Sequence, residues 1–156
     1  MSQITTLKTE ATSYLDLIMK NMIGVYDTTK YGSIPFIYAG LLPLVLCLFY
    51  FASRKVPLKN KFLYGGLFAI LIASFYLVPL NLFWHGMHAP NMFLFRYAYL
   101  FSFLVLLLAG KGWEKIEQDD RGLLLGIILV VATLFAVAWG IKPEGSYTYV
   151  TMTSFV

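Results

Sequence analysis

The chain has 156 residues, of which 59% are hydrophobic, 17% aromatic and only 13% charged, a composition outside the range of soluble globular domains. Its net charge of +4 does not indicate nucleic-acid binding, because the Lys and Arg residues fall mostly in two short loops and form no basic stripe interleaved with aromatic side chains. The single cysteine, Cys47, lies in an apolar run, which excludes an intrachain disulfide and a cysteine-based metal site. We therefore expect an all-α, polytopic integral membrane protein with no nucleic acid among its partners.

Residues 1–33 precede the first long apolar run. Apolar side chains recur there at steps of three and four positions, from Ile4 to Ile23, which is typical of one face of an amphipathic helix. We expect a helix over residues 6–22 that lies on the outer membrane surface or packs over the bundle. Turn-forming residues follow at 24–35 and predict a loop.

Four apolar windows follow in chain order. A bilayer core needs about 20 predominantly apolar residues in helix, and the sequence supplies them in four predicted spans: residues 34–52, 62–83, 93–110 and 122–141. Pro43 and Pro79 fall inside the first two windows, and we expect a bend at each, since neighbouring groups in membrane helices can satisfy the backbone that proline leaves unpaired.

The distribution of Lys and Arg predicts the topology. The loops 53–61 and 111–121 are basic, whereas the connection 84–92 carries no Lys or Arg. By the positive-inside rule the two basic loops are cytoplasmic, so the histidine-containing loop, the N-terminal region and the tail 142–156 are extracytoplasmic. An outside N-terminus without a signal peptide leads us to expect an internal piece of a longer polytopic protein, whose other helices are partners of this region.

Two groups of residues resemble parts of metal sites but lack the remaining ligands. His85 and His88 have the spacing of a zinc pair, but a third ligand on the same side is missing, so we predict no metal and expect hydrogen bonding at the interface. The acidic pair Asp119 and Asp120 lies in a predicted cytosolic loop, where solvation or capping of the fourth span accounts for it.

Arg96 is the only charged residue inside the four windows, about one turn into the third. Its side chain can reach outward to the interface, or it can bind an anion together with the preceding Trp84, His85 and Asn91. Asp27, in the loop before the first span, is either a turn former or an extracytoplasmic functional carboxylate.

The segments "PFIYAGLLPLVLCLFYF" (residues 35–51) and "YLVPLNLFWHGMHAPNMFLFRYAYLFSFLVLLLA" (residues 76–109) resemble the bacterial YfhO membrane protein family. The resemblance covers roughly residues 25–113. It implies a large membrane glycosyltransferase, similar to the GT-C class, that transfers a sugar from undecaprenyl phosphate to lipoteichoic or wall teichoic acid outside Gram-positive cells. The family block is matched by Tyr38, Trp84, His85, Asn91 and Arg96, while Asp27 matches an aspartate less firmly associated with it.

The resemblance suggests roles for these residues. An arginine offers a bidentate fork for the donor phosphate, Trp84 stacks on a sugar or anchors at the interface, and His85 hydrogen-bonds the phosphate or donates a proton. Asp27 is the candidate catalytic base. We expect part of a donor site, without a cofactor and without the full active site. The alternative is a non-catalytic membrane scaffold or transporter-associated subunit, in which the polar residues only anchor the interface.

Overall fold

The computed structural model describes residues 16–19, 21, 35–88 and 95–140, and the regular structure in these ranges is helical. The elements in chain order are α1 (Asp16–Met19), α2 (Leu41–Ala52), α3 (Leu58–Tyr76), α4 (Val78–Trp84), α5 (Ala98–Trp113), the short 3-10 helix η2 (Gln118–Asp120) and α6 (Arg121–Gly140). The all-α class expected from the sequence therefore holds for the described residues.

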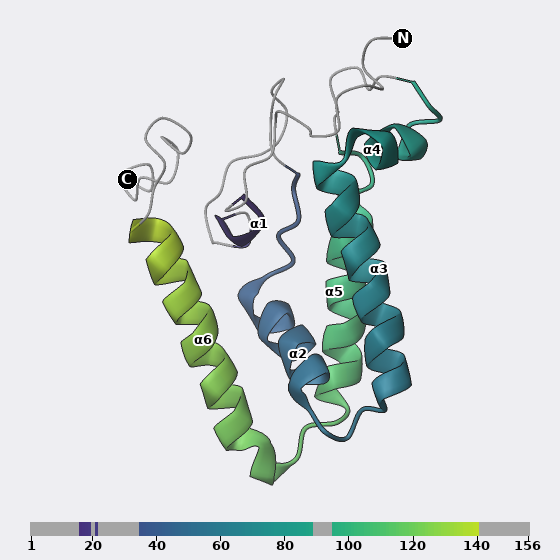
Figure 1. The fold of residues 1–156 in the computed structure, drawn as a ribbon. Helices are drawn as coiled ribbons and strands as arrows, with labels where there is room; N and C mark the ends of the chain where they lie inside the picture. Colours follow the sequence, from purple (N-terminus) through teal and green to yellow (C-terminus); the bar gives the residue numbers. More distant parts are fainter. Residues whose placement is uncertain (1–15, 20, 22–34, 89–94, 141–156) are drawn as a thin grey trace.

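Helices α2, α3 and α5 run side by side, and α4 crosses the end of α3 (Figure 1). Helix α5 packs against α2 and α3, and α4 packs against α3. Helix α6 contacts α2 and α1, and it diverges from α2 toward the end of the bundle where α4 lies. We call this end, with residues 74–88 and 95–97, the α4 end. The opposite end holds the connections 53–57 and 114–120, and we call it the loop end.

The core lies where α2, α3 and α5 meet. Its fully buried members include Phe75 and Leu108, and Phe68 packs edge-on against Phe101 with ring centroids 5.0 Å apart. At the loop end the backbones of α2 and α5 approach closely at Gly112, because a Cβ atom there would lie 2.5 Å from the carbonyl oxygen of Leu46. A small residue at such a point is what close packing of membrane helices requires.

Two helices in the described part are long and apolar enough to cross a membrane, over residues 58–76 and 118–138. Only 17% and 11% of their apolar windows are buried, and they expose large side chains such as Phe62 (77%) and Leu129 (67%). Apolar surface of this extent is unusual for a soluble monomer. Helices α2 and α5 have 12 and 16 residues, or about 18 and 24 Å. The expectation of four spans therefore stays a prediction.

The bend predicted at Pro43 is wrong, because helix α2 begins at Leu41 and Pro43 lies in its first turn. Proline is tolerated there, since the first N–H groups of a helix have no partner within it. Residues 35–40 are not helical, and Gly40, with φ of 98°, precedes the helix. Pro35 and Ile37 of this segment are fully buried.

At Pro79, where the sequence predicts a bend, the structure has a complete break between two helices. Helix α3 ends at Tyr76, Leu77 is extended with φ −104° and ψ 117°, and α4 starts at Val78 with Pro79 in its first turn. The proline cannot donate to the α3 backbone, so the chain leaves the axis of α3 and starts a new helix across its end (Figure 1).

The amphipathic helix expected over residues 6–22 is described only in part. Helix α1 spans four residues, in which Leu17 and Ile18 are half-buried, and it contacts α6. The other residues of that expected helix, except Asn21, lie outside the described residues, so the amphipathic helix stays a prediction.

Candidate functional site

The α4 end gathers polar and aromatic side chains around Ser74, a fully buried residue near the end of α3. The Ser74 hydroxyl donates to the Ile70 carbonyl at 2.7 Å and accepts from the indole N–H of Trp84 at 3.0 Å. The Ser74 carbonyl accepts a hydrogen bond from the hydroxyl of Tyr97. One serine thus connects α3, α4 and the turn that leads into α5.

Tyr97 is the centre of the aromatic contacts at this end. Its ring is nearly parallel to Phe75, with centroids 5.4 Å apart and 12° between the planes, and to Trp84, at 5.2 Å and 19°. The His85 ring lies edge-on to it at 6.1 Å. Only 4% of Tyr97 is exposed, whereas 39% of Trp84 is. The stack therefore holds Trp84 in place while part of its ring stays accessible.

Asn81 lies in α4, and His85 caps the C-terminus of this helix. The Nδ1 atom of His85 is 2.9 Å from the backbone carbonyl oxygen of Asn81. Asn81 is only 7% exposed. The side-chain Oδ1 of Asn81 and the Nε2 of His85 are both buried and without a hydrogen-bond partner. Few buried polar atoms of folded proteins lack a partner, so these two require an explanation.

Arg96 is exposed and lies in the turn at residues 95–97, before α5 begins at Ala98. The expected helix around Arg96 therefore starts after this residue. Since Arg96 directly precedes Tyr97, whose ring stacks on Trp84, the arginine belongs to the same end of the bundle as Trp84 and His85. Its position fits an outward-reaching anchor and an anion-binding group equally well.

The other residues expected to form the site are placed less fully. Tyr38 is half-buried in the non-helical segment before α2. Asp27 and Asn91 lie outside the described residues. His88 is exposed, with its Nδ1 atom 2.9 Å from the Gly86 carbonyl oxygen. Within residues 35–88 and 95–140, no group of three or more His, Cys, Asp or Glu side chains gathers as a metal site would require.

Three residues of this cluster were not among the site residues expected from the sequence: Ser74, Asn81 and Tyr97. Ser74 is a single small hydroxyl residue in an apolar run, which by itself indicates no site. Asn81 carries a signal that sequence reasoning can use, because it is an amide inside a window that is otherwise nearly all apolar. The role of Tyr97 depends on contacts with α3 and α4, which no local pattern reveals.

The loop end is held by ion pairs. The ammonium of Lys55 lies 3.0 Å from a Glu117 carboxylate oxygen and 2.7 Å from one of Asp120, and it also contacts the Lys115 carbonyl oxygen at 3.4 Å. The hydrogen bond to Asp120, with Glu117 contributing, raises the pKa of Lys55 above its usual value. The two connections predicted to share one side of the membrane are therefore joined at one end of the molecule (Figure 1).

Asp120 has a second role at the loop end. Its carboxylate accepts the backbone N–H of Glu117 at 2.9 Å, which completes a capping box on η2, directly before α6. The sequence predicts a cap on the fourth span, and the structure places the cap of Asp120 on η2, the short helix that leads into α6.

Helices α3 and α6 expose large apolar side chains, as the helices of a membrane protein do, and the polar and aromatic cluster forms a candidate site at the α4 end. The chain matches the family described as bacterial membrane protein YfhO over residues 1–156, and it belongs to this family. No curated protein and no solved structure matches the chain.

Proposed function

We propose that this chain is part of a membrane glycosyltransferase that transfers a sugar from undecaprenyl phosphate to a cell-envelope polymer such as teichoic acid. The observation that carries the proposal is the arrangement at the α4 end: a partly exposed Trp84 is stacked on Tyr97, and the exposed cation Arg96 directly precedes Tyr97 in the chain. A lipid-linked sugar presents a phosphate, a sugar and an apolar tail at the membrane surface, and a cation beside an aromatic face suits that combination.

The proposed orientation follows from the two ends of the molecule. The loop end, with Arg54, Lys55 and Lys115 in its two connections, faces the cytoplasm, and the α4 end faces outward. The protein is then a multi-pass component of the bacterial cytoplasmic membrane. The ion pairs of Lys55 with Glu117 and Asp120 join the two basic connections, which supports the proposal that both lie on one side of the membrane.

In the proposed reaction, a hydroxyl oxygen of the acceptor attacks the anomeric carbon of the donor sugar. The bond between that carbon and the phosphate oxygen breaks, and the phosphate leaves with the electron pair. A carboxylate takes the proton of the hydroxyl, and Asp27 is the candidate for this base. Arg96 would bind the leaving phosphate through two parallel N–H donors.

Substitution of Arg96 in the full-length protein tests the proposal. A charge-assisted bidentate contact contributes about 1.5–3 kcal/mol, and about 1.4 kcal/mol corresponds to a factor of ten. Arg96→Ala should therefore slow sugar transfer from an undecaprenyl-phosphate donor at least tenfold. Arg96→Lys keeps the charge but loses the planar fork, so it should restore only part of the rate.

The matched control is Arg54→Ala, which removes the same charge at the loop end, where the side chain is exposed. It should transfer sugar at the wild-type rate when the amounts of membrane-inserted protein are equal. Wild-type transfer by Arg96→Ala, or full restoration by lysine, would make Arg96 an interfacial anchor and would favour the non-catalytic scaffold.

A further inference from the structure

The two unpartnered atoms on α4 point to a ligand. Asn81 Oδ1 and His85 Nε2 are buried on the same helical turn, and neither has a hydrogen-bond partner. A buried polar atom without a partner destabilises the folded protein. His85 directly follows α4, and its Nδ1 lies 2.9 Å from the carbonyl oxygen of Asn81, so both atoms belong to one small region of the α4 end.

The hydrogen bond at the other ring nitrogen of His85 shows what the pair can bind. A backbone carbonyl can only accept, so the contact between His85 Nδ1 and the Asn81 carbonyl requires the proton to be on Nδ1. In the neutral ring, Nε2 then carries a lone pair and acts as an acceptor. Asn81 Oδ1 is an acceptor as well. The pair therefore needs a group that brings hydrogen-bond donors.

This requirement separates the pair from Arg96. A phosphate in its ionised form brings only acceptor oxygens and would be repelled by two more lone pairs. Sugar hydroxyls bring donors, and a sugar ring also presents C–H groups that pack on an aromatic face. Trp84, adjacent to His85 and 39% exposed, supplies such a face.

We propose that Asn81 Oδ1 and His85 Nε2 form a hydroxyl-binding subsite that accepts two hydroxyl groups of a lipid-linked sugar, beside Trp84. The assignment to the donor sugar rests on the proposed function, while the binding of hydroxyl groups rests on the geometry of α4 alone. His85 is then a sugar-binding residue and not a ligand of the phosphate.

The test uses the full-length protein in dodecyldimethylamine oxide, a detergent without hydroxyl groups. Two probes are titrated separately: octyl β-D-glucoside, which carries sugar hydroxyls, and decyl phosphate, which carries only the anion. Loss of one neutral hydrogen bond weakens binding by about fivefold, so Asn81→Leu and His85→Phe should each weaken octyl glucoside binding by about that factor. Neither should change the affinity for decyl phosphate.

His88→Phe is the matched control, because His88 lies in the same turn region and is exposed. It should bind octyl glucoside like the wild type. Arg96→Ala should weaken decyl phosphate binding and leave octyl glucoside binding unchanged. If decyl phosphate binding does not depend on Arg96 while octyl glucoside binding depends on Asn81, the proposed phosphate site fails and the hydroxyl subsite stands.

A buried water molecule would also satisfy both acceptors, and thermal unfolding separates the two occupants. In the absence of sugar, a ligand subsite leaves Asn81 unpaired, so Asn81→Leu should keep or raise the unfolding midpoint. A lowered midpoint together with unchanged octyl glucoside affinity would identify a structural water and overturn the proposal. Asn81→Asp retains an acceptor oxygen at the same position and should restore part of the octyl glucoside affinity.

Discussion

The two ends of the helical bundle satisfy their polar groups in opposite ways. At the loop end, Lys55 meets two carboxylates at 3.0 and 2.7 Å, and its side chain is 34% exposed. At the α4 end, Ser74 is fully buried, and two acceptors on the next helix have no partner. An exposed and paired cluster can hold two loops together. A buried polar cluster with unpaired atoms lowers the stability of the fold, and clusters of this kind are expected at functional sites.

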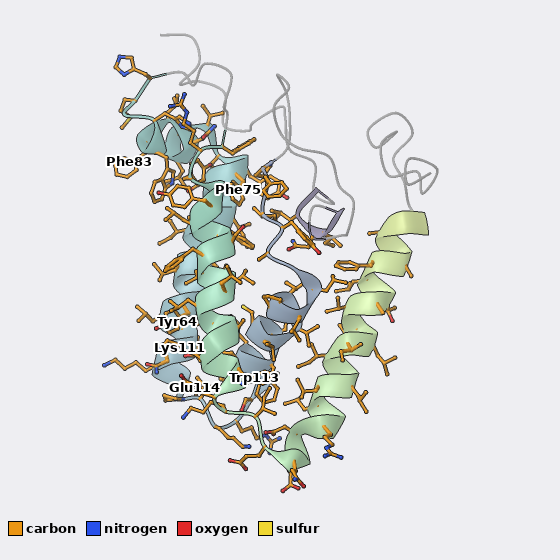
Figure 2. All side chains as sticks on the ribbon, turned by 180° about the vertical axis from the view of Figure 1, so that it is seen from behind. Tyr64, Phe75, Phe83, Lys111, Trp113 and Glu114 are labelled. Carbon is orange, nitrogen blue, oxygen red and sulfur yellow. The ribbon has the colours of Figure 1, made fainter. Side chains whose placement is uncertain are left out.

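Figure 2 shows labelled side chains near both ends of the bundle. The labelled Lys111 and Glu114 extend into the surroundings near the loop end, while Phe75 lies within the bundle toward the α4 end. Phe83, also labelled, extends outward from α4 and is 65% exposed. The α4 end thus combines a packed aromatic interior with an apolar outer surface, which suits contact with lipid.

The largest effect on folding is expected at the centre of the α4 end. Truncation of a buried aromatic side chain costs about 3–5 kcal/mol, so Tyr97→Ala should destabilise the protein by an amount in that range. Tyr97→Phe keeps the stack on Trp84 and loses only the hydrogen bond to the Ser74 carbonyl, which should cost about 1 kcal/mol. Thermal or denaturant unfolding in detergent measures both.

Tyr99→Ala is the control for this prediction, because Tyr99 follows Tyr97 by two residues in the first turn of α5 and is 67% exposed. It should leave the unfolding free energy nearly unchanged. If Tyr97→Ala were no more destabilising than Tyr99→Ala, the aromatic stack would not hold α4 on the bundle, and Trp84 would lose its fixed position.

A smaller effect is expected at Gly112, where α5 meets α2 near the loop end. A methyl group added there would lie 2.5 Å from the backbone oxygen of Leu46, so the two helices must separate. Overpacking of this kind costs about 1–3 kcal/mol. Gly112→Ala should therefore lower the unfolding free energy by that amount.

Gly110 gives a matched control on the same helix, since a Cβ atom there would meet nothing within 4 Å. Gly110→Ala should stabilise the protein by about 0.5–1 kcal/mol, because alanine loses less conformational freedom in a helix. Opposite signs for the two alanines would confirm that the close approach of α2 and α5 contributes stability at the loop end. Equal signs would contradict it.

Composition and apolar windows predicted much of the fold. Each of the four windows contains a helix, because a run of apolar residues in lipid must satisfy its backbone internally. Local patterns did not reveal that residues 35–40 are not helical and that α2 begins only at Leu41. That outcome depends on burial of Pro35 and Ile37 against other helices. A proline in an apolar window indicates either that a helix begins there or that a helix is interrupted there. Tertiary contacts determine which of the two occurs.

The candidate site was predictable in part for the same reason. Arg96 is noticeable in the sequence because it is the only charge inside the four windows, and Trp84 and His85 are noticeable because they begin the connection between two of these windows. Asn81 and Tyr97 gain their roles from partners on other turns or helices. The break before Pro79 makes these contacts possible, since it turns α4 back over Ser74.

The smallest effect is expected for the ion pairs of the loop end. The ammonium of Lys55 is accessible to water, and exposed ion pairs contribute little to stability because solvation and side-chain entropy offset the attraction. Asp120 also accepts the Glu117 N–H, so the capping box persists without the lysine. Lys55→Met should therefore lower the unfolding midpoint only slightly at low salt, and the difference from wild type should vanish at high ionic strength.

The pH dependence of the same variant sharpens the contrast between the two ends. The folded-state pKa of Lys55 is raised above its usual 10.5, mainly by the hydrogen bond to Asp120. A raised pKa means that the contribution of the lysine is present below the unfolded value and fades as the pH rises through the folded one. The unfolding midpoints of wild type and Lys55→Met should thus converge in strongly alkaline solution. Lys59→Met, which removes an exposed positive charge from the first turn of α3, is the control for the loss of charge alone, and its unfolding midpoint near neutral pH should equal that of wild type. A large loss of unfolding free energy in Lys55→Met that persists in high salt would contradict this prediction. The stability of the loop end would then depend on its charges as strongly as that of the α4 end depends on Tyr97.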